Sequence, residues 1–189
     1  QDKVVAINTD TGEEIWTYET GGPVLSSPIV HDQTVYIGSF DHYLYALNTE
    51  TGQLRWRYDA GDRVWISPSL DVENNRLFFG SEQPRVHCLN ATTGQLIWDH
   101  DLTGEGMRNT YPTFANNVVI FQTIKPGASA YKIEEAEPPY TDDATFLEQY
   151  VDYYSRYPQR RHLYYIDADT GEDMWDGSST NYVPVVIPY

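Results

Sequence analysis

The sequence is poor in cysteine, in basic residues and in long apolar runs, and each shortage excludes a class of protein. Its single cysteine, Cys88, permits no intrachain disulfide and no multi-thiolate metal site, which excludes disulfide scaffolds, iron–sulfur clusters and zinc fingers. Only 12 Lys and Arg stand against 28 Asp and Glu, so the formal net charge of −16 excludes nucleic-acid binding through a basic surface and disfavours anionic membranes. No apolar stretch approaches the roughly 20 residues that cross a bilayer, so we expect no direct membrane insertion within this segment.

Core-forming residues, by contrast, are abundant. Of the 189 residues, 40% are hydrophobic and 14% are aromatic, including sixteen Tyr and five Trp. A disordered polyanion would be poor in these residues, so we expect the chain to fold. The acid excess and the scarcity of lysine suit a high-salt habitat, although the same balance also serves ordinary solubility.

Four segments share the motif Ala-x-Asn/Asp-x-x-Thr-Gly-x-x-x-Trp, with Cys and Tyr in place of Ala in the last two copies. The glycines lie 40, 42 and 77 residues apart, and each tryptophan follows its glycine by four residues. The pairs are Gly12 and Trp16, Gly52 and Trp56, Gly94 and Trp98, and Gly171 and Trp175. A repeat of about 40 residues is typical of arrays such as propellers.

Short β-branched and aromatic runs such as Val35-Tyr36-Ile37 lie between the motif copies and are bordered by Gly, Asn and Asp, which predicts strands. Each period holds about four strands, the size of one propeller blade. Within the motif, the Asn or Asp side chain can accept hydrogen bonds from backbone amides that follow it, and Gly supplies a positive φ, so we expect a compact hairpin turn. The tryptophan then lies on the outgoing strand, where its ring can cover the apolar side of the next repeat.

The motif resembles the tryptophan-docking motif of the PQQ-like (quinoprotein-type) β-propeller repeats, a family that includes PQQ-dependent dehydrogenases and BamB-like proteins. The resemblance implies an all-β propeller of four-stranded antiparallel blades, of which this chain holds about four repeats of a larger ring. It implies a half blade at 1–18, blades at 23–58 and 64–99, a blade at 107–176 with an insertion at 124–161, and the start of the next blade at 183–189. Family rings have about seven or eight blades, so we expect the rest of the propeller from the same or another chain.

The insertion at 124–161 is predicted to contain a helix over residues 141–157, which Thr141 or Asp142 can cap and Pro158 stops. The side chains of Phe146, Tyr150 and Tyr154 share one face of this helix. Because the insertion joins the second and third strands of its blade, we expect it on the same face as the blade-to-blade crossings. In the family, that face carries the cofactor or partner site. The helix either packs on its own blade, or covers the funnel and docks a partner.

Four side chains at the crossings are the candidate binding residues: Arg63, Trp65, Arg108 and Asn109. If they project toward the axial funnel, they could bind an anionic or aromatic group or a peptide edge. The alternative is that the arginines pair with neighbouring carboxylates.

Signals for catalysis or metal binding are weak. The vicinal cysteine pair usual in PQQ-dependent dehydrogenases is missing, and Cys88 occupies a small core position of the motif. The five histidines have no ligand-like spacing, so we assign no metal and no catalytic residue.

The sequence therefore favours a non-enzymatic PQQ-like propeller that acts as a protein- or ligand-binding scaffold at its funnel face. By its resemblance to the BamB-like branch, we expect it in the prokaryotic cell envelope, periplasmic or extracellular. One alternative is a PQQ-dependent quinoprotein dehydrogenase for alcohol or sugar oxidation, whose PQQ and calcium ligands lie outside this segment. Another is the extracellular sensor domain of a signalling protein.

Overall fold

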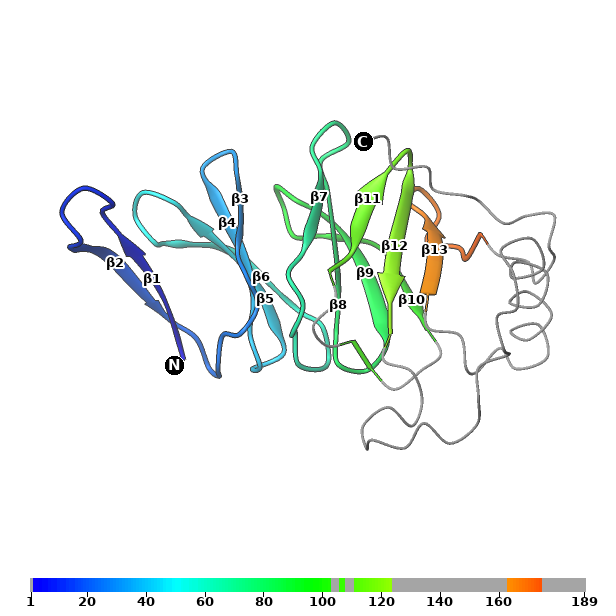
Figure 1. Cartoon of the computed structure of the whole chain (residues 1–189), viewed down its shortest axis with the longest axis horizontal. Coiled ribbons are helices and arrows are strands. Elements are labelled where there is room, and N and C mark those ends of the chain that lie inside the picture. Colours follow the sequence, from blue (N-terminus) through cyan, green and yellow to red (C-terminus); the bar gives the residue numbers. More distant parts are fainter. Residues whose placement is uncertain (1, 103–105, 108–110, 124–162, 175–189) are drawn as a thin grey trace, which may run out of the picture.

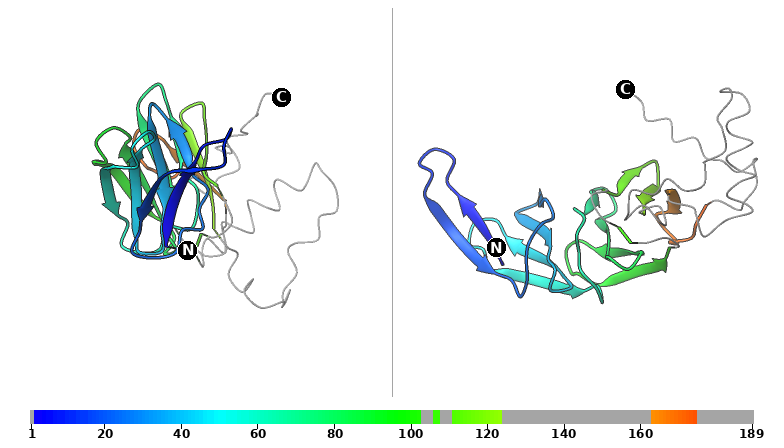
Figure 2. Two further views of the ribbon diagram at one scale, coloured as in Figure 1. Left: turned by 90° about the vertical axis from the view of Figure 1, so that its left-hand side faces the viewer. Right: turned by 60° about the horizontal axis from the view of Figure 1, so that its bottom comes forward.

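The computed structural model describes residues 2–102, 106–107, 111–123 and 163–174, and every regular element within these ranges is a β-strand. The strands form antiparallel sheets that follow one another in chain order as a curved row (Figures 1 and 2). The expectation of an all-β chain built from four-stranded antiparallel blades, as part of a propeller, is confirmed. The predicted helix at 141–157 and the strand at 183–189 lie outside the described residues.

Each sheet is named here as a blade. Blade 1 contains β1 (Lys3–Ile7) and β2 (Glu14–Glu19). Blade 2 contains β3 (Ile29–His31), β4 (Thr34–Gly38), β5 (Tyr43–Asn48) and β6 (Leu54–Asp59). Blade 3 contains β7 (Ser69–Asp71), β8 (Arg76–Gly80), β9 (Arg85–Asn90) and β10 (Leu96–Asp101). Blade 4 contains β11 (Thr113–Ala115), β12 (Val118–Gln122) and β13 (Leu163–Asp167).

The strands differ in burial according to their place in the blade. All five residues of β4 and of β8 are buried, because both faces of these inner strands are covered by neighbouring blades. The outer strand β6 instead alternates between exposed and half-buried residues. This alternation is expected of a strand with one covered face.

The core is divided among the joints between consecutive blades. The joint between blades 1 and 2 is filled by Val4, Val35 and Leu47, with Trp16 packed against them. Two larger clusters fill the following joints, one around Leu77, Phe79 and Leu89 and the other around Phe78, Val119 and Ile166. No blade buries both of its faces alone, so the blades are stable only as a stack.

The repeated motif forms the hairpin turn expected from the sequence. Asn48 Oδ1 accepts hydrogen bonds from the amides of Glu50 and Thr51 at 2.9 and 2.8 Å. Gly52 has a φ of 68°, in the left-handed region that favours glycine. The same side-chain hydrogen bonds recur at Asn8, Asn90 and Asp167.

The motif tryptophans lie over the turns of the following blades. A Cβ atom on Gly52 would lie 2.6 Å from the Trp16 ring, and the Trp16 Nε1 donates to the Thr49 carbonyl at 2.8 Å. The same packing joins Trp56 to Gly94 and Trp98 to Gly171. Around Gly12, no heavy atom of the described residues other than those of Gly12 and its two chain neighbours lies within 4 Å of where a Cβ would be. Trp175 lies outside the described residues.

Candidate interaction face at the blade crossings

The blade-to-blade crossings and the loops between second and third strands lie at the same end of the sheets, below the blades in Figure 1. Phe40, in the β4–β5 loop, donates its amide to the carbonyl of Pro23 in the first crossing at 2.9 Å. Glu82, in the β8–β9 loop, donates its amide to the carbonyl of Arg63 in the second crossing at 2.8 Å. In blades 2 and 3, the loop between the second and third strands therefore lies against the crossing. The insertion at 124–161, for which the same face was expected, lies outside the described residues.

Four side chains meet on this face and are named here the crossing cluster: Phe40, Arg63, Trp65 and Glu82. The Trp65 Nε1 donates to Glu82 Oε2 at 3.0 Å, and Arg63 Nη1 lies 3.4 Å from the same oxygen. The rings of Phe40 and Trp65 lie 4.1 Å apart between centroids, and the Arg63 guanidinium carbon is 5.6 Å from the Phe40 centroid. The cluster therefore ties a loop of blade 2, the crossing and a loop of blade 3 together.

Exposure distinguishes the members of the crossing cluster. The side chain of Arg63 is 50% exposed and that of Glu82 is 17% exposed. Trp65 is half-buried, with part of its ring against the core between blades 3 and 4. An ion pair this exposed contributes little to stability. Arg63 is thus paired with a carboxylate while half of its side-chain surface remains accessible to a ligand.

Of the candidates named from the sequence, only Arg63 and Trp65 belong to the described residues, and the structure brings them together. Arg108, Asn109, Phe146, Tyr150 and Tyr154 lie outside the described residues. Phe40 and Glu82 were missed, although both directly follow a Gly-Ser pair at the same repeat position. That shared position was the available signal, but only the fold shows that they reach the crossing.

The apolar character of this face extends toward blade 1. Leu25 occupies the position in the first crossing that Trp65 occupies in the second, two residues before a Ser-Pro pair. Its side chain is among the exposed large hydrophobic residues, at 60% exposure. Two neighbouring crossings thus carry a large apolar side chain that is not fully buried.

The acidic, histidine and cysteine side chains of the described residues do not gather into a metal-binding group. Within them, no group of three or more His, Cys, Asp or Glu side chains is arranged to hold a metal ion. Cys88 is buried in the sheet, and this burial raises the pKa of its thiol to about 12. A thiol with so high a pKa stays protonated at neutral pH and is a poor nucleophile.

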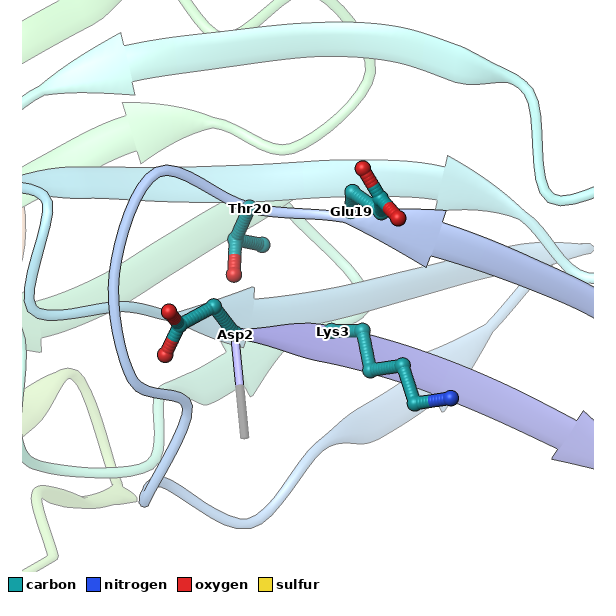
Figure 3. A pocket seen from close by; sticks show the side chains of 4 residues that line it. All are labelled: Asp2, Lys3, Glu19 and Thr20. Carbon is teal, nitrogen blue, oxygen red and sulfur yellow. The ribbon is translucent and has the colours of Figure 1, made fainter.

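An open hollow of about 420 Å³ lies at the end of blade 1, lined by Asp2, Lys3, Glu19 and Thr20 (Figure 3). The Asp2 carboxylate and the Lys3 ammonium group point in opposite directions along the strand. The side chains do not converge on one point, so we assign no function to this hollow. The described residues also contain no helix that could span a membrane.

Comparison with known proteins identifies the family of this chain. The family profile described as "Outer membrane protein assembly factor BamB" matches residues 1–64 and 61–184. The chain belongs to this family. In sequence, no curated protein matches this BamB-like chain.

Solved structures show the same fold. BamB from Moraxella catarrhalis superposes with a TM-score of 0.57 at 17% identity, over 92% of this chain and 42% of its own. The quinohemoprotein alcohol dehydrogenase from Comamonas testosteroni superposes with a TM-score of 0.53 at 21% identity, over 82% of this chain and 21% of its own. For the computationally designed protein Ika8, the TM-score is 0.55 at 16% identity, over 93% of this chain and 46% of its own. This BamB-like chain thus spans less than half the length of each, and the likeness shows the fold alone.

Proposed function

We propose that this BamB-like propeller segment is a non-enzymatic scaffold of the prokaryotic cell envelope, periplasmic or extracellular, and that it binds a protein partner at the blade crossings. The observation that carries the proposal is the crossing cluster. An envelope location is supported by the family description, which names an outer-membrane assembly factor.

The chemistry of the crossing cluster suits protein recognition. Trp and Arg are enriched among the residues that dominate binding energy at protein interfaces. Here the Phe40 and Trp65 rings are held against each other, and Glu82 orients both Trp65 and Arg63. Side chains fixed before binding lose less conformational entropy when a partner docks.

The cluster also specifies what the partner must offer. An apolar or aromatic side chain would pack against the half-buried Phe40 and Trp65 rings. A carboxylate or backbone carbonyl would accept from the exposed part of Arg63. The exposed Leu25 on the next crossing would extend the apolar contact.

Site-specific photo-crosslinking in source cells tests the proposal. A photoreactive residue is placed at Arg63 in the full-length protein and, as the control, at Glu50, an exposed turn residue at the opposite end of blade 2. We expect one discrete protein adduct from position 63 and none from position 50. Equal labelling at the two positions, or none at position 63, contradicts the proposal.

Substitution then measures the contribution of the cluster. With the crosslinked partner purified, the R63A/W65A double variant should bind it at least about 10-fold more weakly, as expected for a pair of central interface residues. Arg55→Ala, at an exposed residue of the outer strand β6, should bind like the unchanged protein. Dye reduction on adding PQQ, calcium and an alcohol to the full-length protein would instead support a dehydrogenase.

A further inference from the structure

A histidine is buried at the joint between blades 2 and 3. His87, on β9, is 2% exposed. Its ring stacks on Phe79 of β8 at 4.8 Å between centroids and 14° between planes. Tyr58 of β6 in blade 2 meets the imidazole edge-on at 5.6 Å. His87 is therefore a packing element of the joint.

The two ring nitrogens of His87 have different surroundings. Nδ1 lies 3.4 Å from the Tyr58 hydroxyl oxygen, a long hydrogen bond. Nε2 is fully enclosed and has no hydrogen-bond partner among the described residues. Buried polar atoms without a partner are rare in folded proteins, because each one costs free energy.

Packing alone does not require a histidine at this position. The corresponding residues of blades 2 and 4 are Tyr45 and Tyr164, which are also buried. The Tyr45 hydroxyl donates to Asp41 Oδ2 at 2.6 Å. In blade 3, the repeat places Gln83 where blade 2 has Asp41. At this position, blade 3 therefore has a titratable imidazole where blade 2 has a tyrosine whose hydroxyl is hydrogen-bonded.

Among the described residues, the charged groups near His87 are already paired with one another. The nearby carboxylates are Asp99 and Asp101 on β10, and the nearby cation is Arg85 on β9. Arg85 Nη2 holds Asp99 Oδ2 at 2.6 Å, and its Nε lies 3.6 Å from the exposed Asp101. The aromatic rings that face the imidazole are those of Tyr58 on β6 and Phe79 on β8.

We propose that His87 makes the joint between blades 2 and 3 sensitive to acid. Protonation at Nε2 places a positive charge among Phe79 and Tyr58 without a partner of its own, and the joint opens so that water can reach the ring. Opening exposes the aromatic faces of both blades, which are buried at neutral pH.

The electrostatics give the direction and the pH window. Burial lowers the pKa of His87 to about 4, against an ordinary value of 6.5. The closed joint therefore holds the neutral ring, whereas the open joint gives the ring its ordinary pKa. Stability from the closed joint is complete above pH 6.5 and is lost as the pH falls toward 4. Within that window, each pH unit favours opening by up to about 10-fold.

Hydrogen exchange of the whole chain between pH 7.5 and 4.5, corrected for the intrinsic rate, measures opening at β6 and β9. Three proteins are compared: unchanged, His87→Tyr, which installs the residue of blades 2 and 4, and His31→Gln, which removes an exposed histidine. The opening equilibrium of the unchanged protein and of His31→Gln should rise by up to about 100-fold, while His87→Tyr stays nearly level. The same rise in all three proteins, or its loss in His31→Gln, overturns the proposal.

NMR titration of the unchanged protein covers the case in which His87→Tyr does not fold. The imidazole signal of His87 should titrate below pH 5, together with loss of amide protection in β6 and β9. Titration near its ordinary pKa while the joint stays protected overturns the proposal.

Discussion

Two neighbouring joints, between blades 2 and 3 and between blades 3 and 4, share the same tryptophan–glycine contact but bury different polar side chains. In each, a motif tryptophan lies over the glycine turn of the next blade, Trp56 over Gly94 and Trp98 over Gly171. The first joint buries the uncharged ring of His87. The second buries a charged arginine with its own counterions. The repeated contact therefore fixes how the blades stack, and the variable positions decide how each joint responds to charge.

The charged joint is organised by Arg76 on β8. Its Nη2 lies 2.7 Å from Asp71 Oδ2 and donates to Asn117 Oδ1 at 2.9 Å. Its Nη1 lies 2.6 Å from Asp169 Oδ1, in the turn after β13 of blade 4. The Arg76 side chain is 7% exposed and that of Asp71 is 2% exposed. Blade 4 is thus attached to blade 3 by a buried, fully paired cation.

Acid affects the two joints in different pH windows. Burial favours the neutral form of Asp71, but hydrogen bonds from Asn74 and Arg76 outweigh it and lower the pKa of the carboxyl below its ordinary 3.8. This stabilisation is present above pH 3.8 and is lost as the pH falls further. The His87 joint is affected between pH 6.5 and about 4. Mild acid should therefore open the joint of blades 2 and 3 first.

The largest effect is expected from Arg76→Met, which keeps much of the apolar volume and removes the charge. The variant leaves Asp71 buried without its cation, which should cost about 3–5 kcal/mol in the free energy of unfolding. Urea unfolding at pH 7 measures the loss. Arg85→Met is the matched control, because it breaks a half-exposed pair with Asp99 and should cost less than about 1 kcal/mol. Similar losses of unfolding free energy in the two variants would mean that burial of the Arg76–Asp71 pair does not set its contribution to stability.

An intermediate effect is expected at the part that the two joints share. Gly94→Ala and Gly171→Ala each place a Cβ at positive φ and against an indole ring, so both should cost about 2–4 kcal/mol. Gly61→Ala also places a Cβ at positive φ, but no heavy atom beyond Gly61 and its two chain neighbours lies within 4 Å of that position, so it should cost about 1–2 kcal/mol. Thermal and urea unfolding of the three variants give the comparison. A Gly61 variant as unstable as the others would assign the whole cost to the backbone.

The smallest effect is expected from Tyr58→Phe, which removes the hydroxyl 3.4 Å from His87 Nδ1. Because that hydrogen bond is long, the change should cost less than about 1 kcal/mol. Tyr45→Phe removes a 2.6 Å bond to Asp41 and should cost about 1–2 kcal/mol. Urea unfolding at pH 7 measures both. A larger loss from Tyr58→Phe would show that the neutral joint depends on this polar contact.

The repeated features were predictable because they depend on local chemistry. The Asn48 turn needs only a side-chain acceptor, two following amides and a glycine with positive φ, all within one short segment. The β-branched and aromatic runs predicted the strands, and the spacing of the motif predicted the propeller. The blade boundaries predicted at 1–18, 23–58, 64–99, 107–176 and 183–189 stay predictions.

The contents of the joints and the crossing cluster were not predictable in the same way. The sequence distances from Arg76 to Asp169 and from Phe40 to Trp65 carry no signal for pairing. Acidic residues are so numerous that a carboxylate partner for Arg63 was expected without being identified as Glu82. Spacing along the chain does not distinguish His87 from the other four histidines, because the burial of its Nε2 depends on Tyr58 and Phe79 from two other strands.

The repeat, its turns and its strands follow from the amino-acid sequence, because they depend on side chains that lie within the same short segment. Which side chains share a joint, and whether their charges are compensated, depends on how the blades stack. Stacking places residues from different blades within a few ångströms and removes water from between them. At the surface, water would solvate a histidine or an arginine. In a joint, the presence or absence of a buried partner changes the free energy of folding.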